Sequence, residues 1–168
     1  MKDRIVFITG ASSGIGLGCA RKFASQGASL ILNARNVTVL EDIKKELETK
    51  YATRVLLLPF DVRNRDEVAK ALTSLSQEWQ AVDVLINNAG LVIGLDKEHQ
   101  GNLDEWDVVI DTNIKGLLTV TRLLVPGMVE RGRGHIINIG SIAGDGAYPG
   151  GSVYCATKFG LFGMTESL

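Results

Sequence analysis

Two residues near the C-terminal end of the sequence have the types and spacing of an acid/base pair. Tyr154 and Lys158 are four residues apart, so on a helix their side chains share one face. A free phenol titrates at about 10, and a neighbouring ammonium favours the phenolate, which brings a phenol toward the range of general acid/base chemistry. The alternative is a half-buried tyrosine beside a solvated lysine, because this spacing also occurs by chance. The other segments must decide between the two.

A glycine-rich segment near the N-terminus has the context of a dinucleotide-binding turn. It follows an apolar run at residues 4–9, which predicts a buried strand, and precedes helical periodicity that extends to residue 24. In this context the backbone approaches a pyrophosphate, and the helix N-terminus offers it unpaired N–H groups. As a bare pattern, the glycines could form only a tight turn. The predicted cofactor contacts are Gly10, Ser12, Ser13, Gly14, Ile15 and Gly16.

The rest of the chain alternates predicted strands and helices. Further strands are expected at residues 28–34, 54–60, 82–86 and 135–139. Amphipathic helices are expected at 37–51 and 64–79, a long helical segment at 103–131, and a last helix with Ser152 as its N-cap. This alternation predicts an α/β fold with a doubly wound parallel sheet of the Rossmann type, whose strands end at one shared edge.

The ends of the second and third predicted strands bear on the choice of nucleotide. The second strand ends at Arg35 without a carboxylate, and an arginine accommodates the 2′-phosphate of NADP where an acidic residue would bind the ribose of NAD. We therefore expect NADP rather than NAD, the alternative being that Arg35 is a solvated loop residue. Asp61 and Val62 follow the third strand. Both are expected to contact the cofactor, Asp61 at the adenine end of the nucleotide. The alternative for Asp61 is that it caps the following turn.

Polar residues also follow the fourth and fifth predicted strands. The fourth strand runs into Asn87-Asn88-Ala89-Gly90, and we expect Asn87, Ala89 and Gly90 to form a wall for the dinucleotide, although a plain polar turn would explain them too. Asn113 lies inside the long helical segment, where asparagine lowers helix propensity; this indicates either a contact needed elsewhere or a solvent-facing position. Ser141 follows the fifth strand and should reach the same edge as Tyr154.

Together these motifs resemble the short-chain dehydrogenase/reductase family over the whole chain. Thr9-Gly10-x-x-x-Gly14-x-Gly16, Asn87 to Gly90, Asn113, Ser141 and Tyr154-x-x-x-Lys158 occur in the family's order and at its spacings. Residues 61–65, 126–131 and 135–141 are similar to the branch of NADP-dependent dehydrogenases that act on 3-hydroxy acids such as serine and allo-threonine. The resemblance implies an oxidoreductase that moves a hydride between NADP(H) and a small alcohol or carbonyl substrate.

The resemblance also implies catalytic roles. Tyr154 would exchange a proton with the substrate oxygen while the hydride moves between the nicotinamide and the substrate carbon. Lys158 would favour the ionised tyrosine and bind the nicotinamide ribose. Ser141 would hydrogen-bond the reacting oxygen and stabilise charge that develops there. Asn113 would support a proton-relay water near Lys158.

Composition sets the remaining expectations. With 45% apolar and 22% charged residues and a net charge of −1, the chain is typical of a soluble globular protein and has no charge pattern for nucleic acid. The apolar run at residues 5–8 is too short for a signal peptide or a membrane span, and Cys19 and Cys155 form no metal or redox spacing. We therefore expect a cytoplasmic protein with reduced thiols, no metal and a small-molecule substrate.

The family pattern continues past the point where this sequence stops, ten residues beyond Lys158. We therefore expect residues 1–168 to form a single dinucleotide-binding and catalytic domain with five of the usual seven strands, without the C-terminal substrate-binding part. The fifth strand would then be an edge with uncovered apolar surface. The full-length form is expected to be a homo-oligomer. The alternative function is a truncated nucleotide-binding module without turnover.

Overall fold

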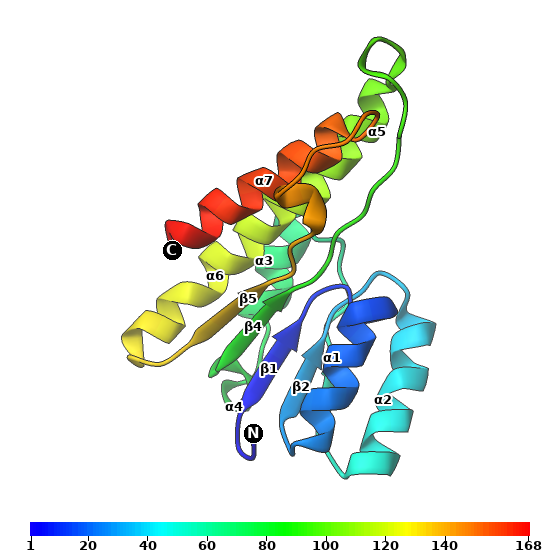
Figure 1. The fold of residues 1–168 in the computed structure, drawn as a ribbon. Coiled ribbons are helices and arrows are strands. Elements are labelled where there is room, and N and C mark those ends of the chain that lie inside the picture. The colour runs from blue at the N-terminus through cyan, green and yellow to red at the C-terminus, as the bar shows by residue number, and fades with distance from the viewer.

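The computed structural model describes residues 1–168 and is built on a five-stranded parallel sheet in the order β3-β2-β1-β4-β5 (Figure 1). The strands are β1 (Ile5–Ile8), β2 (Ser29–Leu32), β3 (Val55–Leu57), β4 (Val84–Asn87) and β5 (His135–Asn138). All five predicted strands are confirmed, each shorter than predicted. β5 is at the edge of the sheet, as expected.

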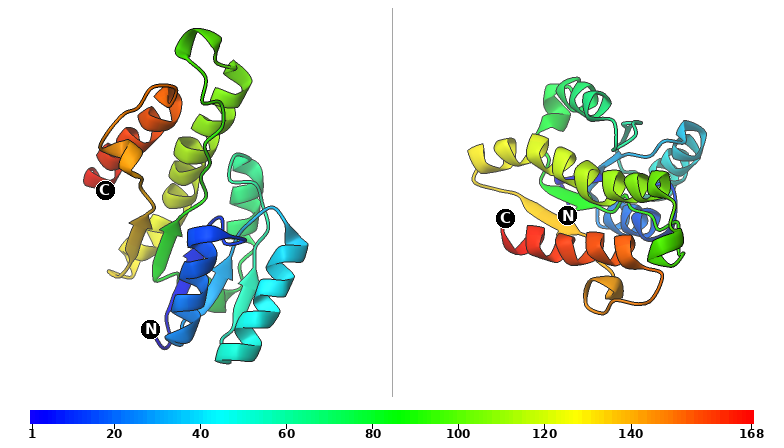
Figure 2. Two further views of the ribbon diagram at one scale, coloured as in Figure 1. Left: turned by 45° about the vertical axis from the view of Figure 1, so that its right-hand side comes forward. Right: turned by 90° about the horizontal axis from the view of Figure 1, so that it is seen from above.

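Helices cover both faces of the sheet (Figures 1 and 2). One face packs against α1 (Gly14–Ser25) and α2 (Val37–Tyr51), and the other against α3 (Arg65–Thr73) and α6 (Leu117–Glu130). Val6 and Ile8 of β1 belong to the first of these cores, and Phe7 to the second. Because both faces of β1 are buried, its sequence is continuously apolar instead of alternating.

Three further helices complete the fold. α4 (Gln77–Gln80) is short, α5 (Leu103–Ile110) follows the long loop after β4, and α7 (Ser152–Glu166) packs beside α5 (Figure 1). A π-helical stretch, Asp111–Gly116, joins α5 to α6. Short 3₁₀ turns lie at Glu98–Gln100 and Ile142–Gly144. None of the helices is long and apolar enough to cross a membrane.

Two predictions about helix ends were wrong. The single helix predicted at residues 64–79 is interrupted between α3 and α4, where the hydroxyl of Thr73 donates to the Ala69 carbonyl and that of Ser74 to the Ala71 carbonyl. Such side-chain bonds to the backbone compete with helix continuation. Ser152 is the first residue inside α7 instead of its N-cap; Gly151 occupies that position without a side-chain bond.

The turn between β1 and α1 is fastened to the end of β4. Thr9 Oγ1 accepts hydrogen bonds from the backbone N–H groups of Asn88 and Ala89, both at 3.0 Å. Asn88 Nδ2 donates to the carbonyls of Thr9 at 3.0 Å and Gly10 at 2.9 Å. A side chain on Gly16 would collide with the Gly10 carbonyl and with Asn88 Nδ2. The first turn of α1 therefore packs directly on the residues that join β1 to β4.

At the opposite end of the sheet, Asp83 connects three strands. Its Oδ2 accepts the backbone N–H of Ile5 at 2.9 Å, and its Oδ1 lies 3.0 Å from an Arg4 nitrogen and 2.7 Å from an Arg133 nitrogen. The carboxylate is only 5% exposed. Asp83 directly precedes β4, and its partners lie beside β1 and β5, so one buried carboxylate sets the start of all three strands.

We expect Gly16→Ala to lower the free energy of unfolding by about 2 kcal/mol, because the added methyl group overpacks the contact with Gly10 and Asn88. The matched control is Gly18→Ala in the same helix, where a side chain would meet open space. That change should raise stability by about 0.5–1 kcal/mol, because alanine favours helix. Urea unfolding of the two variants measures both values; equal stabilities would contradict the close approach.

We expect Asp83→Ala to lower the free energy of unfolding by about 2 kcal/mol or more, because the N–H of Ile5 loses its buried acceptor and two arginines lose their partner. Glu46→Ala, which removes a more exposed ion pair with Arg21, should have a much smaller effect. The comparison is made by chemical denaturation. If Asp83→Ala lowers the free energy of unfolding no more than Glu46→Ala does, the three-strand connection contributes little to stability.

Candidate active site

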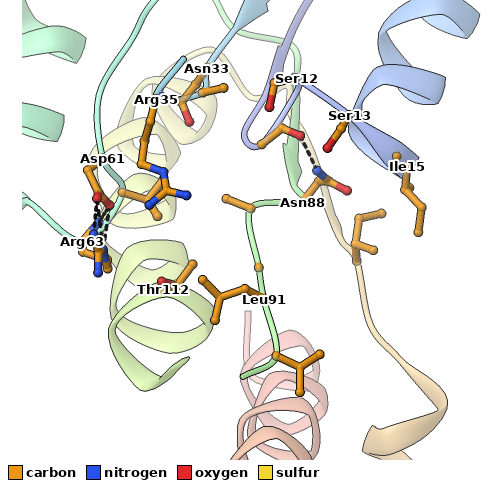
Figure 3. A pocket seen from close by; sticks show the side chains of 18 of the residues that line it. Ser12, Ser13, Ile15, Asn33, Arg35, Asp61, Arg63, Asn88, Leu91 and Thr112 are labelled. Atoms are coloured by element: carbon orange, nitrogen blue, oxygen red, sulfur yellow. Dashed lines mark hydrogen bonds and ion pairs between the residues drawn. The ribbon is translucent and has the colours of Figure 1, made fainter. Parts of the chain in front are cut away.

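A cavity of about 500 Å³ lies at the carboxyl ends of the strands (Figure 3). It includes the point where β1 and β4 adjoin and the strand order reverses. Ligands of open α/β sheets bind at this kind of switch point. Most of the residues singled out from the sequence line this cavity. They are Gly10, Ser12, Ser13, Gly14, Ile15, Arg35, Asp61, Val62, Ala89, Gly90, Tyr154 and Lys158.

The glycine-rich turn presents free backbone donors to this cavity. Gly10 and Gly14 have positive φ angles of 63° and 52°, which glycine adopts without strain. α1 begins after Ser13, whose side chain makes no capping bond, whereas Asn36, Asn64 and Asn102 cap the N-termini of their helices. The first N–H groups of α1 are therefore available to an anionic ligand, and the helix dipole favours negative charge there.

Three charged residues gather on the other side of the cavity (Figure 3). Arg35 follows β2, and Asp61 and Arg63 follow β3. Arg63 Nη2 lies 2.6 Å from Asp61 Oδ2, and Arg63 Nε lies 3.0 Å from both carboxylate oxygens. These hydrogen bonds from Arg63 lower the pKa of Asp61, and the charge of Arg35 adds a smaller contribution in the same direction.

Tyr154 and Lys158 enter the cavity from the first half of α7. The ammonium nitrogen of Lys158 lies 5.8 Å from the centre of the Tyr154 ring and donates to the Ile139 carbonyl at 2.9 Å. Burial lowers the pKa of the Lys158 ammonium. Both side chains therefore lie in one cavity on one helix face, and a single backbone carbonyl fixes the position of the lysine.

Asn113 lies behind the cavity wall in the π-helical stretch and is only 4% exposed. Its side-chain amide pairs with the backbone of Leu91, accepting from N–H and donating to C=O, both at 2.9 Å. Nδ2 also donates to Thr157 Oγ1 at 3.1 Å. A single side chain thus connects the loop after β4 to the helix that carries Tyr154 and Lys158. The predicted contact elsewhere is confirmed, and the solvent-facing alternative was wrong.

Three other predicted site residues do not line the cavity. Ser141 follows Gly140, which does line it; Ser141 Oγ accepts the N–H of Ala143 at 3.1 Å and keeps its own proton free. Asn87 is buried, and its amide nitrogen donates at 2.9 Å to both Thr121 and Asn138. Its side chain therefore points into the protein and not toward a ligand. Gly16 is buried beneath the turn, as described above.

The cavity also contains residues that the sequence did not single out as site residues. They are Asn33, Ala34, Phe60, Arg63, Asn88, Leu91, Val92, Thr112, Ile139 and Gly140. Six of them are the last residues of a predicted strand or follow one within two residues: Asn33, Ala34, Phe60, Asn88, Ile139 and Gly140. Counting every strand end as part of the site would have found these six, whereas Arg63, Leu91 and Val92 lie further along the loops. Thr112 gave no such signal, because only the packing of the π-helical stretch brings it to the cavity.

Curated relatives share most of this chain. An NADP-dependent 3-hydroxy acid dehydrogenase of Salmonella typhi is 47% identical over 154 residues, which cover 92% of this chain and 60% of the relative. An NADP-dependent 3-hydroxy acid dehydrogenase of Schizosaccharomyces pombe is 44% identical over 169 residues, which cover 100% of this chain and 65% of the relative. The chain thus spans less than two thirds of the length of these relatives.

Solved structures agree with the fold. A serine dehydrogenase from Escherichia coli matches with a TM-score of 0.88 and 44% identity, over 94% of this chain and 71% of that chain. A metagenomic short-chain oxidoreductase in complex with NADP matches with a TM-score of 0.93 and 35% identity, over 99% and 75% of the two chains. The family model for short chain dehydrogenases matches residues 4–168. The chain therefore belongs to the short-chain dehydrogenase family.

Proposed function

We propose that residues 1–168 form the nucleotide-binding and catalytic domain of an NADP-dependent oxidoreductase that interconverts a small alcohol and its carbonyl compound. The observation that carries the proposal is the shared cavity of the Tyr154–Lys158 pair and the glycine-rich turn. A tyrosine–lysine pair suited to acid/base chemistry and backbone donors suited to a pyrophosphate line the same cavity, which supports hydride exchange with a dinucleotide.

The residues present fit a nicotinamide dinucleotide with a 2′-phosphate. The uncapped N-terminus of α1 and the two glycines with positive φ would hold the pyrophosphate. Arg35, which forms no ion pair within the protein, would bind the 2′-phosphate. Two relatives bear names that specify NADP. When bound, this cofactor supplies or accepts the hydride.

The protein's own groups would handle the proton. The Tyr154 hydroxyl gives its proton to the carbonyl oxygen during reduction, and the Tyr154 phenolate takes one from the alcohol during oxidation. Lys158 uses one ammonium hydrogen on Ile139, which leaves two for the ribose hydroxyls, and its charge stabilises the phenolate. Ser141 retains a free hydroxyl proton with which to bind the reacting oxygen.

Asn113 would act by holding other parts of the site in position. Its two amide hydrogens and its oxygen are engaged by Leu91 and Thr157, so the side chain holds the loop and α7 together. A β-carbon at Gly90 would lie 3.2 Å from Asn113 Oδ1 and 3.8 Å from Lys158 Nζ, which means that the three residues adjoin. A proton-relay water at this place stays a prediction of the family resemblance.

The substrate class we propose is a 3-hydroxy acid, supported by the names of the curated relatives. The proposal includes a cytoplasmic homo-oligomer. The free thiols of Cys19 and Cys155 support the cytoplasmic location. Several exposed apolar side chains on α6 and α7 support the formation of an oligomer. These apolar residues are Leu118, Leu123, Val129, Phe159 and Phe162.

We expect Tyr154→Phe to slow turnover of a 3-hydroxy acid about 10²–10⁴-fold, because the variant lacks the proton donor and acceptor. NADPH binding by isothermal titration should change little. Tyr51→Phe, at the end of α2 and outside the cavity, serves as the control. Turnover is followed by NADPH formation with a panel of 3-hydroxy acids. Full activity of Tyr154→Phe would refute the proposed acid/base role.

The same assay separates the enzyme from its alternative. NADPH binding without turnover of any alcohol or carbonyl substrate by the 168-residue chain would favour a nucleotide-binding module. A folded chain that binds neither NADPH nor NADH would refute both functions.

We expect Arg35→Asp to weaken NADPH binding about tenfold or more while NADH binding changes much less, because a charge-assisted bond to the 2′-phosphate is replaced by repulsion. Lys45→Asp makes the same charge change on an exposed part of α2 and should leave the ratio of the two affinities unaltered. Both dissociation constants are measured by titration. Equal weakening of NADPH and NADH by Arg35→Asp would show that Arg35 does not read the phosphate.

A further inference from the structure

The carboxylate of Asp61 is at a disadvantageous place for a phosphate site. It lines the same cavity as Arg35, and its pKa is lowered mainly by the hydrogen bonds from Arg63 and to a smaller extent by the charge of Arg35. A 2′-phosphate carries about 1.5–2 negative charges at neutral pH, so a free carboxylate nearby would repel it. An unpaired carboxylate would also compete with the phosphate for the Arg35 guanidinium. The cavity thus contains an anion that opposes the binding for which Arg35 is suited.

Arg63 removes this conflict in the structure. Its guanidinium contacts both carboxylate oxygens of Asp61, and its backbone N–H donates to Asp61 Oδ1 at 3.0 Å. The dashed lines of Figure 3 join Asp61 to Arg63 and leave Arg35 beside them without a bond. The Asp61 side chain is 24% exposed and that of Arg63 is 33% exposed, so the pair is partly shielded from solvent.

Hydrogen bonds at the start of α3 hold the turn that carries the pair. The Asn64 N–H donates to the Asp61 carbonyl at 2.9 Å, and the Asn64 side chain caps α3 by accepting from Glu67 N–H. Asp61 and Arg63 therefore face each other across a short turn that the start of α3 fixes. Two guanidinium groups and one carboxylate leave this side of the cavity with one net positive charge; without Arg63 the net charge would be zero.

We propose that Arg63 is a specificity-determining residue that acts through Asp61: it neutralises that carboxylate and so keeps Arg35 free to bind the 2′-phosphate. This inference rests on the proposed NADP-dependent function and deepens it. Arg63 is a positioning residue here, because the phosphate is bound by Arg35. A direct bond from Arg63 to the phosphate is the competing explanation.

The test uses 2′,5′-ADP and 5′-AMP, two probes that differ only in the 2′-phosphate, in isothermal titrations of the 168-residue chain. We expect Arg63→Gln to lower the ratio of the 2′,5′-ADP affinity to the 5′-AMP affinity about tenfold. Addition of Asp61→Asn to this variant should restore the ratio to within about threefold of wild type, since the repelling charge is gone. Arg63→Lys keeps the positive charge, so its ratio of the two affinities should also stay within about threefold of wild type.

A matched control is Arg65→Gln, which removes the same charge two residues further on, outside the cavity. Its affinity ratio should stay within about twofold of wild type. Urea unfolding of every variant checks that the fold is kept. If Arg63→Gln keeps the wild-type ratio, or if Asp61→Asn fails to rescue it, the shielding role of Arg63 is refuted while the NADP assignment stands. If wild type itself binds both probes equally, the NADP assignment fails, and the role of Arg63 fails with it.

Discussion

The hydrogen bonds between the ends of β1 and β4 are the constraint on which the rest of the site depends. Thr9 and Asn88 exchange four bonds across the two strand ends, counting those to Gly10 and Ala89. They hold the glycine-rich turn against the strand beside which the sheet reverses its order. The start of α1 lines the cavity, and its first N–H groups have no side-chain cap. Hydrogen bonds within the protein therefore hold these backbone donors in place.

Asn113 provides a second connection of the same kind. A short polar side chain can imitate a strand partner, and here it pairs with the backbone of Leu91 while it also contacts Thr157. The π-helical stretch that contains it interrupts an otherwise regular helix, a cost that proteins often accept at functional sites. Gly116, in the same stretch, packs so closely on Val62 that a side chain would not fit. Local irregularity thus gives α7 its position over the strand ends.

Charged side chains lie at both sides of the cavity. Lys158 is partly desolvated, which disfavours its charged form, and the Ile139 carbonyl compensates some of that loss. At the other side, Arg63 offsets the charge of Asp61 while Arg35 remains without a protein partner. The cavity therefore places positive groups at both sides and backbone donors between them. A long polyanionic ligand with a separate reactive end would be complementary to such a distribution.

The sequence by itself determined the order of strands and helices, the parallel sheet and most of the cavity-lining residues. Strand ends of a parallel sheet meet at one edge, so motifs such as Gly10 to Gly16 and Tyr154 with Lys158 could be assigned to that edge from the sequence. Only the tertiary structure decided that Asn87 points into the core and that Asn88 ties the strands, since the direction of a side chain depends on its neighbours. The π-helical stretch, the Asn113 contacts and the Asp61–Arg63 pair were decided there too. Each depends on packing or on the geometry of a turn, which helical periodicity does not encode. The residue type at position 113 indicated a contact, but only the structure gives its partners, Leu91 and Thr157.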